Sequence, residues 1–190
     1  MLFAFLRSTL LETLHGRFAK GIYIDTGSHR FVVSASDAFV GRSLASNGSH
    51  AGSELQVLKA LVSPESRVLI LGAHIGSLGI PLACHVRSVV FVEANPETFD
   101  LLSANVSLNS VGNAVLHNVA VGDKQGEMEF LQNRLNSGGS KRKPKQVRWI
   151  YYYDRPDVVR VPMVTVDELL ADDGADLVVM DLEGSEYFAL

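Results

Sequence analysis

The stretch Arg67–Gly79 reads RVLILGAHIGSLG, an apolar run that ends at three glycines, Gly72, Gly76 and Gly79. A continuous apolar run of this length is typical of a strand buried on both faces of a parallel sheet. Glycines after such a strand let the backbone approach a ligand closely and donate from a helix N-terminus. The stretch therefore predicts a strand, a ligand-binding turn and a helix in succession.

The spacing of these glycines is G-x-x-x-G-x-x-G, whereas dinucleotide-binding turns have G-x-G-x-x-G. The close glycine pair that a pyrophosphate needs is absent. Glu93 ends the next predicted strand, SVVFVE, about 20 residues further on, where a carboxylate accepts the two hydroxyls of a ribose. The turn and the carboxylate together predict a ribose-containing cofactor without phosphates, such as S-adenosylmethionine.

The composition is that of an ordinary globular protein. The 190 residues are 47% hydrophobic and 20% charged, and the net charge is -4. This acidic balance gives no general attraction to nucleic acid or to an anionic membrane, so we expect no nucleic-acid partner and no stable membrane insertion. The single cysteine, Cys84, lies in an apolar setting, which predicts a buried thiol, no internal disulfide and a cytoplasmic location.

Residues 1–50 are predicted to form an N-terminal extension, and residues 51–190 the cofactor-binding domain. The apolar positions of residues 6–14 have helical spacing and predict a docking helix. Two β-rich runs in residues 21–36 predict a hairpin, and the glycine-rich residues 37–52 predict a loop.

Predicted strands and helices alternate after the extension. Helices are expected at 53–62, with Ser53 as its cap, at 75–86, at 95–110 and at 166–171; strands are expected at 67–71, 88–93, 114–121, 126–132, 159–166 and 176–184. The residues 136–148 read as a mobile loop. This alternation predicts an α/β fold, a mostly parallel, doubly wound sheet with helices on both faces.

Four motifs carry a resemblance to a known family. LGAHIG, VEANPETFDLLSANVSLN, NVAVGD and VVMDLEGSE resemble, in order and spacing, the FkbM-type methyltransferases, and the likeness runs from Asp37 to the last residue. The resemblance implies the Rossmann-like class I methyltransferase fold, S-adenosylmethionine as cofactor, and O-methylation of a small molecule or a glycan.

The resemblance also implies which residues bind the cofactor. The glycine turn lines its methionine side, Glu93 holds the ribose, Asn95 shapes the turn beneath it, and residues 120–121 flank the adenine. The implied cofactor-binding residues are Gly72, Ala73, His74, Gly76, Glu93, Asn95, Ala120 and Val121. Ile70 stands where family members usually carry an acidic residue, so one carboxylate near the cofactor's amine and sulfonium is missing.

Two carboxylates at the end of the last predicted strand are the candidate catalytic residues. Asp181 and Glu183 would lie on one face of an extended segment, and a hydroxyl acceptor needs a general base to take its proton. A purely structural alternative stays open, in which Asp181 caps the following turn and Glu186 is solvated. His50 and His85 have no partner at metal-ligand spacing, so we expect no metal site, although paired carboxylates such as Asp181 and Glu183 can also hold a divalent ion.

The basic and aromatic stretch SKRKPKQVRWIYYYDR allows two interpretations. Basic side chains next to aromatic rings are typical of nucleic-acid binding, but the acidic balance of the chain favours a lid whose basic side chains bind an anionic acceptor and whose aromatic rings cover a sugar. The chain stops at EGSEYFAL, where the family continues through further strands. The sequence therefore indicates a domain without its C-terminal strands, either a fragment or a sheet that a partner completes, and oligomerisation stays open. A noncatalytic binding or assembly module is the alternative function.

Overall fold

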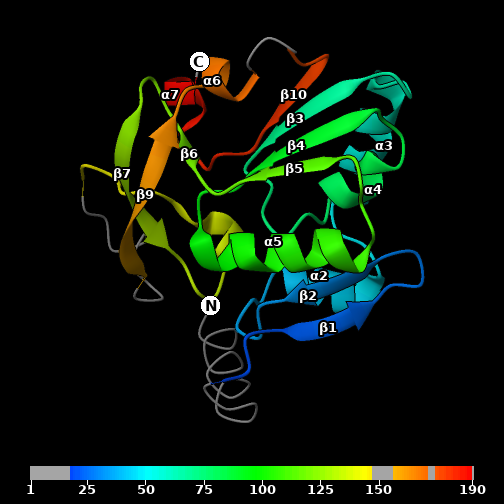
Figure 1. The fold of residues 1–190 in the computed structure, drawn as a ribbon. Helices are drawn as coiled ribbons and strands as arrows, with labels where there is room; N and C mark the ends of the chain where they lie inside the picture. Colours follow the sequence, from blue (N-terminus) through cyan, green and yellow to red (C-terminus); the bar gives the residue numbers. More distant parts are fainter. Residues whose placement is uncertain (1–17, 147–155, 171–173, 190) are drawn as a thin grey trace.

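The computed structural model describes residues 18–146, 156–170 and 174–189. Its central element is a four-stranded parallel sheet with the strand order β10-β3-β4-β5 (Figure 1). These strands are β3 (Arg67–Leu71), β4 (Ser88–Val92), β5 (Ala114–His117) and β10 (Leu177–Met180). The predicted α/β class with a mostly parallel sheet is confirmed.

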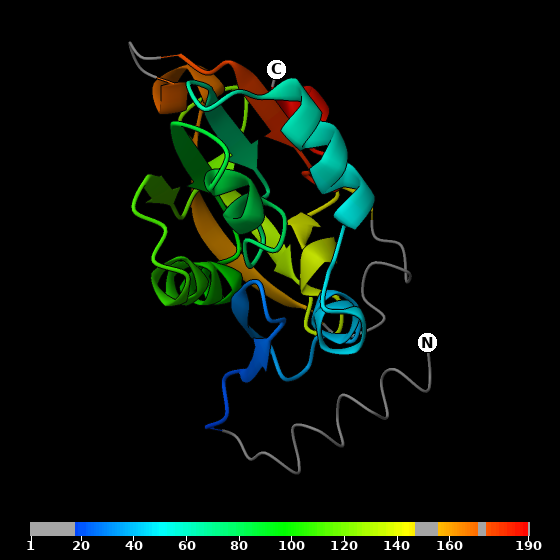
Figure 2. The same cartoon turned by 90° about the vertical axis from the view of Figure 1, so that its right-hand side faces the viewer.

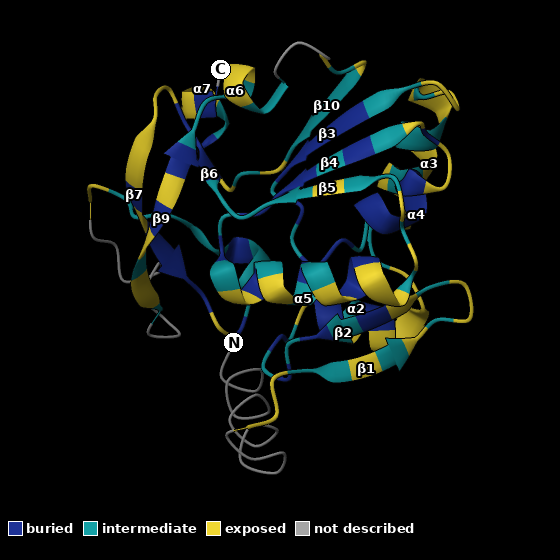
Figure 3. Cartoon of the chain, viewed as in Figure 1, coloured by how far each residue is buried: buried dark blue, intermediate teal, exposed yellow. Residues whose placement is uncertain are grey.

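Helices cover both faces of this sheet. On one face lie α3 (Gly52–Leu61), α4 (Gly79–Ala83) and α5 (Pro96–Leu108), and on the other lie the short helices α6 (Val166–Leu170) and α7 (Glu186–Ala189). Strand β3 shows why: Val68 and Ile70 belong to the first hydrophobic cluster, and Leu69 and Leu71 to the second. Both faces of β3 are buried, as Figure 3 shows, and this explains its continuous apolar sequence.

The helix after β4 begins where the sequence predicts. The side chain of Asn95 accepts from the N–H groups of Glu97 and Thr98, and Pro96 occupies the first turn, where no N–H is needed. The cap predicted for α3 is wrong, because Ala51, with a φ of 56°, precedes that helix and makes no side-chain cap. The hydroxyl of Ser53 donates instead to Glu54, at 2.7 Å.

A second sheet has the order β6-β9-β7-β8. Its strands are β6 (Ala120–Val121), β7 (Gly126–Gln132), β8 (Lys141–Arg142) and β9 (Asp157–Val164). The single strand predicted at 114–121 is therefore wrong, since β5 and β6 lie in different sheets. Between them, Nδ2 of Asn118 donates to the carbonyl oxygen of Glu93 at 2.8 Å and fixes the break.

Residues 37–52, predicted as a loop, contain helix α2 (Val40–Asn47). Oδ1 of Asp37 accepts from the N–H groups of Phe39 and Gly41, and Leu44 is buried one turn after Val40. The apolar pattern of α2 covers only eight residues, and the glycines and serines of residues 37–52 favour a loop when the sequence is considered alone. Residues 136–146, predicted as mobile, likewise contain a 3-10 turn, η1 (Ser137–Gly139), and β8.

The remaining predictions concern the N-terminal helix, the aromatic stretch, Cys84 and membrane insertion. The helix predicted at residues 6–14 and the aromatic residues 149–153 lie outside the described residues. Cys84 is exposed, contrary to the expected buried thiol, because it follows the end of the short helix α4. Within the described ranges, no helix is both long and apolar enough to cross a bilayer.

The hairpin of β1 (Ile22–Asp25) and β2 (Arg30–Val33) lies beneath α5 and beside α2 (Figures 1 and 2). Two asparagines of α5 hold it there. Asn105 accepts from Val32 N–H at 2.6 Å and donates to the carbonyls of Val32 and Ile75, and Asn109 bonds both backbone groups of Arg30. The hairpin shares a hydrophobic cluster with the parallel sheet, and the boundary at residue 50 stays a prediction.

We expect Asn105→Ala to lower the free energy of unfolding by about 3 kcal/mol, because it leaves the N–H and carbonyl of Val32 and the buried carbonyl of Ile75 without their partner. Urea unfolding measures this loss. Ser107→Ala, on the exposed side of the same helix, is the control and should change stability by less than about 0.5 kcal/mol. An Asn105→Ala protein as stable as the control would refute this role of the asparagine.

Candidate functional site

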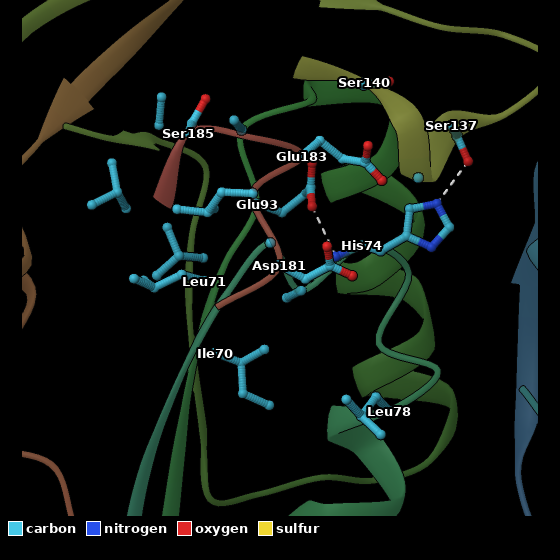
Figure 4. Close-up of a pocket in the computed structure, with 18 of the residues that line it drawn as sticks. Ile70, Leu71, His74, Leu78, Glu93, Ser137, Ser140, Asp181, Glu183 and Ser185 are labelled. Carbon is cyan, nitrogen blue, oxygen red and sulfur yellow. Dashed lines mark hydrogen bonds between the residues drawn. The ribbon is translucent and has the colours of Figure 1, made fainter. Parts of the chain in front are cut away.

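The site lies at the carboxyl ends of the parallel strands. The strand order reverses between β3 and β10, and open α/β sheets bind their ligands at such a switch point. A cavity of about 310 Å³ is found there. Its walls come from the turn after β3, the end of β4, the segment after β10 and the β7–β8 connection (Figure 4).

Gly72 brings the ends of β3 and β10 together. Its φ is 83°, which glycine adopts readily, and a Cβ at this position would overlap the carbonyl oxygen of Asp181. Gly72 lines the cavity, but Gly76 does not. A Cβ at Gly76 would press on Ile80 and Leu102, so this second glycine lets the turn pack against α4 and α5.

Glu93 joins the turns after β3 and β4. One carboxylate oxygen accepts from the N–H of His74 and the other from the N–H of Asn95, both at 2.8 Å. Glu93 is only 7% exposed, and this burial raises its pKa to about 7 despite the backbone hydrogen bonds that favour the ionised form. Each oxygen retains lone-pair capacity, so the carboxylate that lines the cavity can also accept from a ligand hydroxyl.

The backbone of the glycine turn bonds mainly to the protein itself. The N–H groups of Gly72 and Ala73 both donate to the carbonyl of Val92 at 2.9 Å, and the N–H of Gly76 donates to the carbonyl of Ala73. The N–H of His74 is bonded to Glu93. These amides therefore fix the shape of the turn, whereas the sequence led us to expect donors for the ligand.

His74 ties the turn to two distant segments. Its Nε2 lies 2.7 Å from Oγ of Ser137, which donates to Oδ2 of Asp37 at 2.5 Å, so the imidazole donates to the serine (Figure 4). Burial lowers the pKa of His74 to about 4, although the nearby Asp37 opposes this shift. The imidazole is therefore neutral near pH 7 and brings no positive charge to the cavity.

The two candidate catalytic carboxylates, Asp181 and Glu183, both line the cavity and are exposed to it. Oε2 of Glu183 lies 3.4 Å from Nζ of Lys141. The carboxylate of Asp181 has no ion-pair partner among the described residues. The carboxylate of Glu186 accepts from the N–H groups of Leu182 and Gly184, which closes the turn. A hydrogen bond from its own backbone N–H, together with these two, lowers the pKa of Glu186.

Most of the predicted cofactor-binding residues come together at the cavity. Those that line it are Gly72, Ala73, His74, Glu93, Ala120 and Val121. Asn95 lies outside it, 1% exposed, and supports the site by capping α5 and bonding Glu93 and Ser140. Ile70 also lines the cavity, so the strand contributes an apolar surface where the family usually has an acid.

Several lining residues were not predicted. Phe39 comes from residues 37–52, which are predicted to form a loop. Ser137, Ser140 and Arg142 come from residues 136–148, which are predicted to be mobile. Only the basic character of the second segment pointed toward a ligand. The contacts that order both segments join residues far apart in the chain, such as Asp37 and Ser137, and no local pattern reports them.

A protein-family model matches the part of the chain that contains the glycine turn and Glu93. Residues 45–135, just under half of the chain, match the TRM5/TYW2 methyltransferase domain. The match confirms the predicted enzyme class, an S-adenosylmethionine-dependent methyltransferase, and the predicted cofactor. It does not favour the alternative of a noncatalytic module. No curated protein matches the chain.

Solved structures with some similarity to this chain include the following three. Methyltransferase FkbM from Methylobacillus flagellatus is 17% identical over 67% of this chain and 28% of its own, with a TM-score of 0.45. M. jannaschii TYW2 in complex with AdoMet is 22% identical over 51% of this chain and 42% of its own, with a TM-score of 0.40. The M. jannaschii tRNA m1G37 methyltransferase is 20% identical over 54% of this chain and 32% of its own, with a TM-score of 0.41. The chain thus spans less than half the length of each.

These comparisons correct one expectation. The sequence led us to expect no nucleic-acid partner, and this is wrong as a general exclusion, because one of the similar structures is a tRNA methyltransferase. The net charge of the chain is a property of its whole surface. It does not decide which acceptor a single cavity takes.

We expect Gly72→Ala to lower the free energy of unfolding by more than about 2 kcal/mol, because alanine is strained at a φ of 83° and its Cβ would collide with Asp181. Thermal or urea unfolding measures the change. The matched control is Gly112→Ala, where a Cβ meets nothing within 4 Å. Equal stability of the two variants would contradict the close approach of β3 and β10.

Proposed function

We propose that this chain transfers the methyl group of S-adenosylmethionine to a hydroxyl of a small molecule or glycan. The observation that carries the proposal is the meeting of Glu93 with the turn after β3 in one cavity at the switch point of the sheet. A carboxylate next to a tight turn after the first core strand suits a nucleoside ligand. The FkbM-type motifs are consistent with this acceptor class.

The residues divide into two roles in this proposal. Glu93 accepts the ribose hydroxyls, and residues 120–121, together with the apolar side chains of Met128 and Phe130, line the side for the adenine. When bound, S-adenosylmethionine supplies an electrophilic methyl group whose sulfur leaves as a neutral thioether. The protein then mainly holds the acceptor oxygen in line with that methyl group.

Asp181 is the residue that we assign as general base. A hydroxyl must lose its proton as its oxygen bonds to the methyl carbon, and a carboxylate at the rim of the cavity can take this proton. Glu183 also lines the rim, but its carboxylate faces Lys141. The carboxylate of Glu183 is thus engaged by a cation, whereas Asp181 has no ion-pair partner among the described residues and is open to an acceptor hydroxyl.

A tRNA acceptor is the second candidate, because the M. jannaschii tRNA m1G37 methyltransferase is among the similar structures. One assay separates the two candidates. The protein is incubated with S-adenosylmethionine labelled in its methyl group, once with a panel of hydroxyl compounds and sugars and once with total tRNA. Label in the small-molecule fraction alone supports the first candidate, and label in the RNA fraction alone refutes it.

Binding of S-adenosylmethionine should depend on pH through Glu93. The ionised carboxylate is the better acceptor for hydroxyls, and its pKa is about 7. We therefore expect nearly full affinity above this pKa, a decline as the pH falls through it, and a plateau of weaker binding once the carboxyl is protonated. Calorimetry between pH 6 and 8 measures this slope.

The same titration tests the assignment with two variants. Glu93→Gln should weaken binding about 10- to 100-fold at pH 8, the loss of one charge-assisted hydrogen bond, and should abolish the slope. Glu97→Gln, an exposed residue in the first turn of α5, should keep both affinity and slope. An unchanged pH slope in Glu93→Gln would remove Glu93 from the ribose site.

For catalysis, Asp181→Asn should lower kcat about 100- to 10,000-fold, with the affinity for S-adenosylmethionine within threefold of the original. Glu183→Gln should have a smaller effect, because Glu183 is paired with Lys141. Asp167→Asn, on the exposed side of α6, is the control. Full turnover by Asp181→Asn would exclude this residue as the base.

A further inference from the structure

Arg142 lines the cavity with an uncommitted donor. Its Nη1 is buried, and no hydrogen-bond partner for it is found among the described residues. A guanidinium carries five N–H donors and a positive charge at every physiological pH. A buried donor without an acceptor costs about 1–3 kcal/mol. A donor of this kind in the wall of a cavity is available to an anionic ligand.

The guanidinium is held in place before any ligand binds. Arg142 lies on β8, where it pairs with Phe130 of β7. Its guanidinium carbon lies 4.4 Å from the centre of the Phe188 ring, within the range of a cation–π contact. Strand and ring together restrict the side chain, so less conformational entropy is lost when it bonds a ligand.

Among the described residues, the permanent positive charge of the cavity wall comes from Arg142. Within the described part of the chain, Arg142 is the one arginine or lysine among the lining residues. The imidazole of His74 is neutral near pH 7, and the amides of residues 72–74 are bonded to the protein. Carboxylates dominate the rest of the polar wall, with Glu93, Asp181 and Glu183.

Ser140 adds a second donor two residues before Arg142, and it also lines the cavity. Its Oγ accepts from the N–H of Asn133 at 3.0 Å and from Nδ2 of Asn95 at 3.2 Å. Both lone pairs of the hydroxyl are therefore used, and its own hydrogen remains to be donated. Residues two apart on an extended segment face the same side, so the two donors serve one region.

We propose that Arg142, assisted by Ser140, is an oxyanion-binding position of this cavity, which takes a carboxylate or phosphate oxygen. The oxyanion has two sources, the carboxylate of the cofactor or an anionic group of the acceptor. The first source rests on the proposed function, and the second does not require it. Acids at one part of the wall and a cation at another suit a ligand with charges of both signs.

Calorimetry on the full chain tests the position with three probes: S-adenosylmethionine, its decarboxylated form and inorganic phosphate. Arg142→Met removes the charge and keeps an apolar stem. Lys143→Met is the matched control, because Lys143 follows Arg142 directly but pairs with Glu129 at 2.9 Å and does not line the cavity. The control should bind all three probes as the original protein does.

Two results support the proposal and identify the source. A loss of about 10- to 100-fold in affinity for S-adenosylmethionine, with unchanged binding of the decarboxylated form, assigns the cofactor carboxylate. Unchanged binding of S-adenosylmethionine, with loss of the phosphate binding of the original protein, assigns an anion of the acceptor. If Arg142→Met binds all three probes with the affinity of the original protein, the proposal is overturned.

A different result refutes the proposed function: the original protein binds neither S-adenosylmethionine nor its decarboxylated form. The phosphate titration then still decides the role of Arg142, since original protein without phosphate binding would also overturn it. Circular dichroism establishes whether Arg142→Met folds. If it does not, Arg142→Gln replaces it, because this variant keeps polar donors and much of the side-chain length but removes the charge.

Discussion

The buried carboxylate of Glu93 accepts one backbone N–H from the turn after β3 and another from the turn after β4. The two turns are thereby fixed relative to each other, and the cavity between them has a defined shape without a ligand. Burial makes this carboxylate costly to ionise and raises its pKa to about 7. The carboxylate that fixes the two turns is thus also a group whose protonation would change the affinity for a ligand.

Around this carboxylate, close packing and charge are supplied by different residues. Gly72 allows the ends of β3 and β10 to approach, which brings Asp181 to the rim. The network of Asp37, Ser137 and His74 joins the β7–β8 connection to the same turn. Segments separated by about a hundred residues therefore form one continuous wall, in which acids and the guanidinium of Arg142 hold separate positions.

The sequence predicted those parts of the fold that depend on local pattern. The apolar runs of β3 and β4 and the start of α5 directly after β4 agree with the structure. Glu93 and Asp181 could be placed because both follow parallel strands. Helix α2, the break after β5 and the order of residues 136–146 could not, since side chains distant in sequence determine them.

The break between β5 and β6 has a structural consequence of its own. The chain leaves the parallel sheet at His117 and joins the second sheet at Ala120, so one wall of the cavity belongs to a sheet that β7 and β9 complete. Among the described residues, none between those two strands pairs with β3, β4 or β5. The strands that carry the glycine turn and Glu93 are therefore held by pairings separate from those of the second sheet, which supplies another wall of the same cavity.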